Sequence, residues 1–108
     1  TGKNLSAGQR QMISLARALY NDPKFVVLDE PHTYVDEAGF HLVLAAVDAL
    51  RKKKVTTIVI TDRSNLIVNM DKLLLLKEGQ AIMYGPRQKV LEQLANKKQS
   101  QQAIGATA

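Results

Sequence analysis

The sequence of 108 residues predicts an α/β fold in which helices cover a parallel β-sheet. Two short apolar runs, residues 25–28 and 55–60, lack polar alternation, which is typical of strands buried on both faces. Each run follows a segment whose apolar residues recur at helical spacing. Helix and strand in that alternation favour a layered sheet with right-handed crossover connections.

Helical periodicity defines the segments that flank these strands. A first helix is expected over about residues 7–20, before Asn21-Asp22-Pro23 stops the pattern. A second helix is expected to begin near Val35 or Asp36 and to end in the basic cluster at residues 51–54. Because cations offset the negative end of a helix macrodipole, we interpret that cluster as a solvated helix end.

The rest of the chain is expected to add a hairpin and a closing helix. In chain order, the sequence predicts a short helix capped by Ser64-Asn65, strands over 72–76 and 80–84 joined by a turn at Glu78-Gly79, and a helix over 88–95. So short a chain can hold only one modest core, and we expect a single domain over residues 1–96. Residues 97–108, rich in Lys, Gln and Ala, are expected to form a mobile tail.

The amino-acid composition excludes several kinds of functional site, but it does not indicate which kind of partner the protein binds. The chain has no cysteine, which excludes disulfides, thiolate metal sites and cysteine nucleophiles. The longest apolar stretch, around Leu73–Leu76, is far shorter than the roughly 20 residues that cross a bilayer. The net charge of +5 suits nucleic acid, anionic lipid and a phosphate ligand equally well. The opening Thr1-Gly2-Lys3 lacks an initiator Met, which favours a cut over a natural start.

The segment Ser6-Ala7-Gly8-Gln9 stands where the first helix begins. Free backbone N–H groups and the positive end of the helix dipole make such a tip suited to an anion. Small residues allow close approach of a phosphate, while Ser6 can donate its hydroxyl and Gln9 can reach a sugar or a water. An ordinary Ser-capped helix with a nearby glycine is the alternative interpretation of this segment.

Asp29 and Glu30 follow directly on the first predicted strand. In open α/β sheets ligands collect at the carboxyl ends of strands, where one carboxylate can hold Mg2+ through a retained water. Its neighbour could then orient or deprotonate an attacking water. The alternative is a pair of solvated carboxylates in a turn before Pro31, although four apolar residues leading into Asp-Glu-Pro are unusual for a plain turn.

The histidines offer no second kind of chemistry. His32 and His41 have no Cys or second His at ligand spacing, so polar or interface roles are expected for both. The sequence contains no recognisable Ser-His-Asp arrangement, and a nucleophilic role for Ser6 has no support.

These motifs, in this order and spacing, resemble the signature helix and Walker B strand of an ATP-binding cassette (ABC) transporter ATPase. The residues that carry the resemblance are Leu5-Ser6-Ala7-Gly8-Gln9-Arg10-Gln11, Leu15–Leu19, Asp22-Pro23-Lys24 and Val27-Leu28-Asp29-Glu30-Pro31. The likeness extends to about residue 95, through Thr57–Thr61, Asp71-Lys72 and Gly79. Arg63-Ser64 and Tyr84-Gly85-Pro86-Arg87 look most like exporters of the bacterial type 1 protein secretion class.

The resemblance implies a P-loop NTPase-like fold, of which this chain would be the C-terminal half, and an ATPase that uses ATP and Mg2+. It implies a head-to-tail dimer in which Leu5, Ser6, Ala7, Gly8 and Gln9 of one subunit cover the γ-phosphate of ATP held by the other. By the same resemblance, the remaining roles are Mg2+ binding through water for Asp29, general base for Glu30 and dimer-interface loop for Asp36.

The resemblance also implies partners and a location. The partners would be a second nucleotide-binding domain, the transmembrane domain of the same transporter, and a secretion adaptor with outer-membrane proteins. The location would be the cytoplasmic face of the bacterial inner membrane, and no nucleic acid would be bound.

The chain departs from the family pattern at three points. The phosphate-cradling pattern G-x-x-x-x-G-K-[ST] is absent, so this polypeptide alone is expected to hold ATP poorly and to be inactive. Asp62 stands where the family has a switch histidine, and a carboxylate there would repel the γ-phosphate, so hydrolysis is expected to weaken. Ala7 replaces the commoner glycine, which is tolerable where φ is negative.

Two alternative functions follow from these features. Asp62 could disable turnover and leave an ATP-dependent clamp that binds without hydrolysing. The basic balance could instead suit an ABC ATPase acting on DNA, but that function predicts coiled-coil heptads or a basic stripe with aromatics, and the chain has neither.

Overall fold

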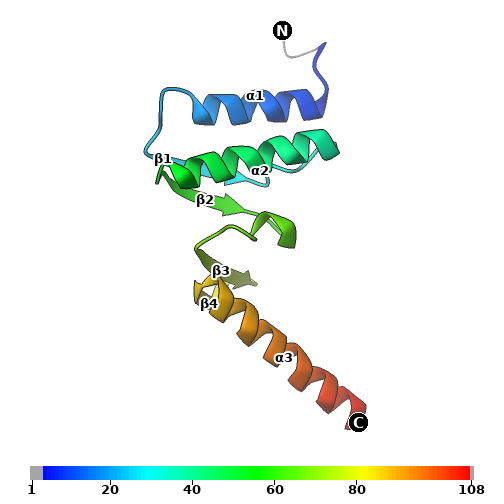
Figure 1. Cartoon of the computed structure of the whole chain (residues 1–108). Coiled ribbons are helices and arrows are strands. Elements are labelled where there is room, and N and C mark those ends of the chain that lie inside the picture. The colour runs from blue at the N-terminus through cyan, green and yellow to red at the C-terminus, as the bar shows by residue number, and fades with distance from the viewer. Residues whose placement is uncertain (1–3, 108) are drawn as a thin grey trace. The chain divides into compact units, whose positions relative to one another are not determined.

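The structure, a computed structural model, describes residues 4–107. The helices and strands follow in the order α1 (Ala7–Leu19), β1 (Phe25–Asp29), α2 (Glu37–Lys52), β2 (Thr56–Ile60), the 3-10 turn η2 (Ser64–Leu66), β3 (Lys72–Lys77), β4 (Gln80–Pro86) and α3 (Arg87–Thr107) (Figure 1). They form two compact units that divide after Leu66. The predicted α/β class is confirmed, and boundaries of the first two helices fall within two residues of expectation.

The first unit is built on a parallel pair of strands. β1 pairs with β2 in a register that sets Phe25 opposite Thr56 and Asp29 opposite Ile60. Parallel strands need a crossover connection, and α2 supplies it. The register brings the carboxyl ends of both strands to the same level of the sheet.

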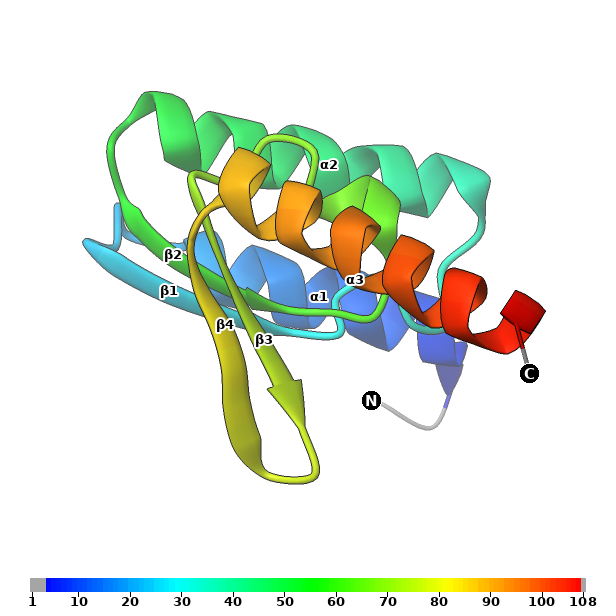
Figure 2. The same ribbon diagram turned by 90° about the horizontal axis from the view of Figure 1, so that it is seen from below.

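Only one face of this strand pair is buried. Val26 and Leu28 lie in the core, whereas Phe25 and Val27 are exposed, so the expectation of strands buried on both faces is wrong for these residues. The reason is the placement of the helices. α1 contacts β1, α2 contacts β2, and the two helices contact each other, which puts both on the same side of the sheet (Figures 1 and 2).

The core of the first unit is made where these helices meet the buried face of the strands. Its helical members are Leu15 of α1 and Val43, Val47 and Leu50 of α2. Val43, Val47 and Leu50 recur at spacings of four and three residues, so they share one side of α2. The polar side of each helix is thereby left to solvent.

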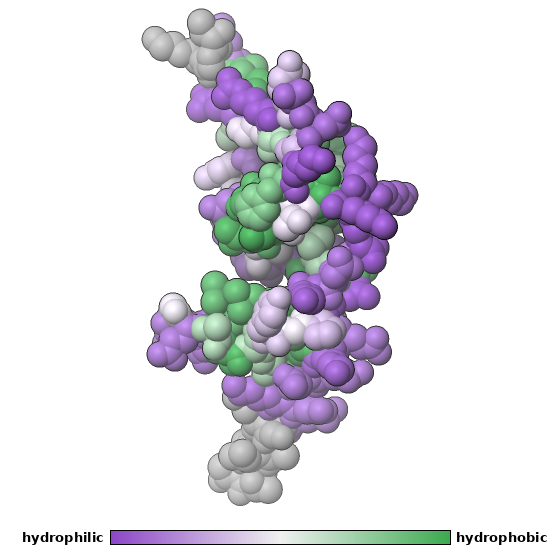
Figure 3. Space-filling view, turned by 90° about the vertical axis from the view of Figure 1, so that its left-hand side faces the viewer, coloured by the Kyte–Doolittle hydropathy of each residue, from purple (hydrophilic) through white to green (hydrophobic). Residues whose placement is uncertain are grey.

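The second unit is an antiparallel hairpin with a helix packed on it. β3 pairs with β4, with an irregularity between Leu75 and Leu76. Glu78 and Gly79 turn the chain with φ values of 52° and 77°, the left-handed pair that a tight hairpin turn requires. α3 contacts both strands and buries Val90. Apolar surface remains open in each unit, as the green areas of Figure 3 show.

The closing helix is longer than expected. A helix was predicted over residues 88–95 followed by a mobile tail over 97–108, but α3 runs from Arg87 to Thr107. Lys, Gln and Ala are strong helix formers, and no glycine or proline interrupts them before Gly105, so local propensity favours continuation. Mobility of this segment stays a prediction, and residue 108 lies outside the described residues. Within residues 4–107, no helix combines the length and apolar character that a bilayer crossing needs.

The adjacent residues Leu42 and Val43 provide a matched test of this packing. Val43 is 0% exposed and Leu42 is 59% exposed on the same helix. Val43→Ala is expected to lower the free energy of unfolding by about 2 kcal/mol through lost apolar burial and a residual cavity. Leu42→Ala is expected to change it by less than about 0.5 kcal/mol. Denaturant unfolding followed by circular dichroism measures both, and equal losses would contradict the packing described.

Candidate functional site

The predicted anion-binding tip is a capped helix start. Ser6 is the N-cap of α1: its Oγ accepts from the Gln9 backbone N–H at 3.1 Å, and Gln9 Oε1 accepts from the Ser6 N–H at 2.9 Å. This reciprocal pair is a capping box, and it leaves the N–H groups of Ala7 and Gly8 at the tip without an intrahelical acceptor. The Ser6 hydroxyl hydrogen also stays available, because Oγ acts here as an acceptor. The tip is thus both a cap and a place where N–H groups can meet an anion.

The acid pair lies at the carboxyl end of β1. Asp29 is the last residue of the strand, opposite Ile60, and Glu30 begins the following turn. The Glu30 N–H donates to the Ile60 carbonyl at 2.7 Å, which extends the β1–β2 ladder by one residue. Both acids are exposed. Glu30 has φ of 46°, a left-handed conformation that costs a residue with a side chain about 1–2 kcal/mol.

A compact turn carries the chain from Glu30 to α2. The Thr33 N–H donates to the Glu30 carbonyl at 3.1 Å, and the Val35 N–H donates to the His32 carbonyl at 3.4 Å. Asp36 then caps α2, its Oδ1 accepting from the Gly39 N–H at 2.8 Å. The Asp36 side chain, expected in a dimer-interface loop, therefore caps a helix of its own chain.

α1 touches this turn at two places. Gln11 Nε2 donates to the Glu30 carbonyl at 3.4 Å. At Gly8, an added Cβ would stand 2.6 Å from the Tyr34 carbonyl oxygen, closer than the Cβ atoms of other residues approach a non-bonded atom. Gly8 is needed here for space. Sequence reasoning assigned no such role to Gln11 or Tyr34, because both contacts depend on how a helix packs against a distant turn.

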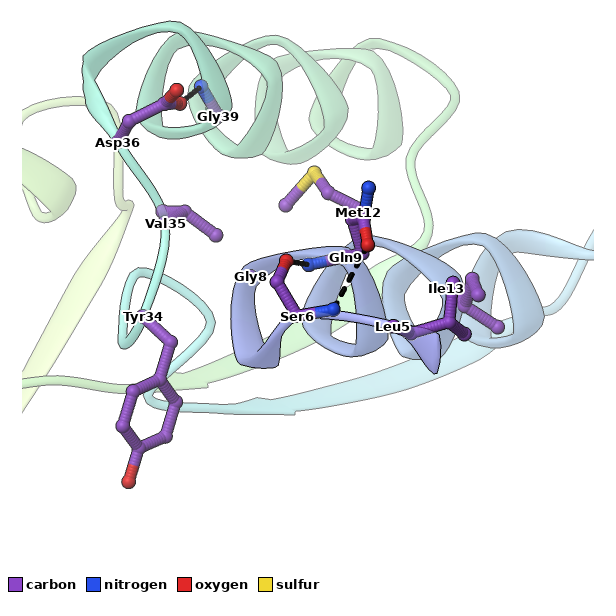
Figure 4. A pocket seen from close by; sticks show the side chains of 10 residues that line it. All are labelled: Leu5, Ser6, Gly8, Gln9, Met12, Ile13, Tyr34, Val35, Asp36 and Gly39. Atoms are coloured by element: carbon purple, nitrogen blue, oxygen red, sulfur yellow. Dashed lines mark hydrogen bonds between the residues drawn. The ribbon is translucent and has the colours of Figure 1, made fainter. Parts of the chain in front are cut away.

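A cavity of about 590 Å³ opens between the start of α1 and the start of α2 (Figure 4). Its lining includes Ser6, Gly8 and Gln9 from the helix tip together with Val35 and Asp36. Figure 4 shows the Tyr34 ring pointing away from the other labelled side chains. The structure therefore gathers the predicted tip and the predicted interface loop around one hollow of the same subunit.

The third predicted position, Asp62, lies at the end of β2 in contact with a histidine. His32 Nε2 stands 3.4 Å from Asp62 Oδ1, and His32 Nδ1 stands 3.5 Å from Thr61 Oγ1. The His32 side chain is 9% exposed and the Asp62 side chain 86%. His32 was expected to have a polar role, and its contacts are polar. Its pairing with Asp62 was not foreseen, because the two are far apart in the sequence.

The residues at the strand ends are suited to a metal ion that also takes oxygen ligands from a bound phosphate compound and from water. Among residues 4–107, no group of three or more His, Cys, Asp or Glu side chains could by itself hold a metal ion. Asp29 offers one exposed carboxylate, and Mg2+ is commonly held by one or two carboxylates together with substrate phosphates and water. The donor set therefore fits Mg2+ that arrives with a nucleotide.

The α/β fold, with acids at the end of β1, is that of ATP-binding cassette domains, which are P-loop NTPase-like. The family model described as "ABC transporter" matches residues 1–33. A solved dimeric ATP-binding cassette in a post-hydrolysis state with ADP and Pi superposes with a TM-score of 0.70 at 26% identity, over 76% of this chain and 36% of that one. The chain is therefore similar to the ATP-binding cassettes of ABC transporters over most of its length.

The curated relatives include proteins of different transport systems. The type I secretion system ATP-binding protein PrsD of Rhizobium meliloti is 40% identical over 91% of this chain. The ATP-dependent lipid A-core flippase of Ralstonia nicotianae is 37% identical over 84% of this chain. The chain spans only 17% of the first relative and 15% of the second.

The crowding at Gly8 predicts that Gly8→Ala changes stability in the opposite direction to an ordinary glycine-to-alanine change in a helix. Replacing a helical glycine by alanine by itself favours folding by roughly 1 kcal/mol. Gly8→Ala is nevertheless expected to destabilise the protein by about 1–3 kcal/mol, because its Cβ must displace the Tyr34 carbonyl. Denaturant midpoints measure the change. Ser14→Ala, at an exposed position of the same helix, is the control, and a Gly8→Ala variant more stable than the parent would contradict the close approach.

Proposed function

We propose that the chain is the C-terminal part of the ATP-binding and ATP-hydrolysing domain of an ABC exporter. Residues 1–96 would belong to that domain. The observation that carries the proposal is the juxtaposition of Asp29 and Glu30 at the end of β1 with the end of β2, linked by the 2.7 Å bond from Glu30 to Ile60. Ligands of open α/β sheets bind at such ends.

In this proposal Glu30 is the general base that takes a proton from the attacking water. Its side chain is exposed, while its backbone is held by the Ile60 carbonyl and by donors from Thr33 and Gln11. A left-handed residue held on both its backbone groups supports a functional role, since such strain is concentrated at active sites. Asp29 would bind Mg2+ through water, and Mg2+ would neutralise charge on the phosphates.

The helix tip would act on nucleotide held by a second copy. Leu5, Ser6, Ala7, Gly8 and Gln9 would cover the γ-phosphate across a head-to-tail dimer, with Asp36 in the interface loop. The N–H groups of Ala7 and Gly8, which have no intrahelical acceptor, support this role, because a helix N-terminus favours an anion. The dimeric state of the solved cassette that this chain resembles also supports it.

The further partners proposed are the transmembrane domain of the same transporter and, for a type 1 secretion exporter, an adaptor and outer-membrane proteins. The corresponding location is the cytoplasmic face of the bacterial inner membrane. Similarity to PrsD supports the secretion class, and the similar identity of a lipid A-core flippase makes the general exporter role the broader proposal.

Glu30→Gln tests the proposed base. In the full-length transporter, this variant is expected to lose at least about 100-fold in kcat for ATP while it still binds nucleotide, because the amide cannot accept the proton. Phosphate release and equilibrium ATP binding measure the two effects. Glu37→Gln is the control, since Glu37 is 92% exposed in the first turn of α2. Unchanged hydrolysis in Glu30→Gln would remove Glu30 from the mechanism.

A nonhydrolytic clamp is the second candidate function, and the exposed carboxylate of Asp62 favours it. Its negative charge near a γ-phosphate would oppose the charge that develops during hydrolysis. Single-turnover hydrolysis by the intact homodimer separates the candidates. The ATPase is expected to convert bound ATP to ADP and phosphate, whereas the clamp would release ATP unchanged.

A further inference from the structure

A histidine and a carboxylate meet beside the proposed nucleotide site, and the proposed reaction leaves their contact unexplained. His32 comes from the turn after β1 and Asp62 from the segment after β2. Their nearest polar atoms, Nε2 and Oδ1, are 3.4 Å apart. The His32 side chain is 9% exposed and the Asp62 side chain 86%, so a nearly buried imidazole ring contacts an exposed carboxylate.

An ionised carboxylate can only accept, so a favourable contact with Asp62 requires a hydrogen on His32 Nε2, and the neighbouring hydrogen bonds are compatible with this arrangement. The Arg63 N–H donates to Thr61 Oγ1 at 2.9 Å, which leaves the Thr61 hydroxyl hydrogen free for His32 Nδ1 at 3.5 Å. With Nδ1 accepting, the neutral imidazole carries its hydrogen on Nε2. A protonated imidazole also has a hydrogen on Nε2. In either state, Nε2 carries a hydrogen and lies 3.4 Å from the Asp62 carboxylate oxygen.

The residues on either side of Asp62 are anchored as well. Thr61 binds the Arg63 N–H, and the Arg63 guanidinium lies 5.5 Å from the centre of the Phe40 ring. Phe40 belongs to α2, so the segment is tied to the helix as well as to the turn. The Asp62 backbone is thus held between its neighbours, while its exposed side chain depends on His32 for a fixed direction.

We propose that His32 is a positioning residue that directs the Asp62 carboxylate and offsets its charge, so that a nucleotide polyphosphate can bind at the ends of β1 and β2. The inference rests on the proposed function, because it requires a polyphosphate at this edge of the sheet. An unpaired carboxylate at the end of β2 repels phosphate, and an N–H group directed at it reduces that repulsion. His32 therefore influences nucleotide affinity more than the chemical step.

Two substitutions of His32 separate the contact with Asp62 from the contact with Thr61. The glutamine amide nitrogen occupies roughly the place of Nε2, so His32→Gln keeps a donor toward Asp62. The asparagine amide occupies roughly the place of Nδ1, so His32→Asn reaches only Thr61. In the full-length transporter, His32→Asn is expected to raise the KM for ATP about threefold to tenfold with kcat changed less than about twofold. His32→Gln is expected to stay close to the parent.

Neutralising Asp62 provides the decisive comparison. In the His32→Asn background, Asp62→Asn is expected to return the KM to within about twofold of the parent, because the repelling charge is gone. A structural defect at His32 would not be repaired in this way. An unchanged KM in His32→Asn, an equal rise in His32→Gln, or no recovery in the double variant would each overturn the inference.

These outcomes are distinct from failure of the proposed function. A parent transporter that neither binds nor hydrolyses ATP would overturn the proposed function, whereas normal ATPase activity with a KM insensitive to His32→Asn overturns only the role of His32. Thermal unfolding of each variant checks folding. If His32→Asn does not fold, Thr61→Val takes its place, since losing the hydroxyl frees the ring to turn from Asp62 and is expected to raise the KM in the same direction.

Discussion

The parallel register of β1 and β2 is the constraint on which the candidate site depends. It sets Asp29 opposite Ile60, and the 2.7 Å bond from the Glu30 N–H to the Ile60 carbonyl carries the pairing one residue into the turn. A slip of one residue would move Val26 and Leu28 out of the core, so burial of these side chains fixes the register. The same burial therefore brings Glu30, His32 and Asp62 to one edge of the sheet.

Strain at Glu30 is compensated by the bonds around it. Its φ of 46° is unfavourable for a residue with a Cβ, yet its N–H reaches Ile60 and its carbonyl receives donors from Thr33 and Gln11. Net gains of about 1 kcal/mol for each such bond are comparable to the cost of the left-handed conformation. The exposed side chain makes none of these bonds, so it is free for chemistry while its backbone is held.

The sequence predicted local features well and long-range contacts poorly. Periodicity located α1, α2 and both strands of the first unit, and the Glu-Gly pair located the hairpin turn, because each signal lies within a few neighbouring residues. The burial of β1 was overestimated, since an apolar run does not reveal on which side the helices pack. Likewise Gly8 against Tyr34, Gln11 against Glu30 and His32 against Asp62 each join distant segments, and no local pattern marks them.

Two of those long-range contacts, Gly8 against Tyr34 and Gln11 against Glu30, join α1 to the turn after β1 within one subunit. At Gly8 an added Cβ would stand 2.6 Å from the Tyr34 carbonyl oxygen, so the helix tip packs closely on the turn, and the Gln11 amide nitrogen donates to the Glu30 carbonyl at 3.4 Å. Close-packed contacts of this kind transmit displacement instead of absorbing it. We expect a ligand bound at the N–H groups of the tip to influence the turn that carries Glu30 and His32 through these contacts.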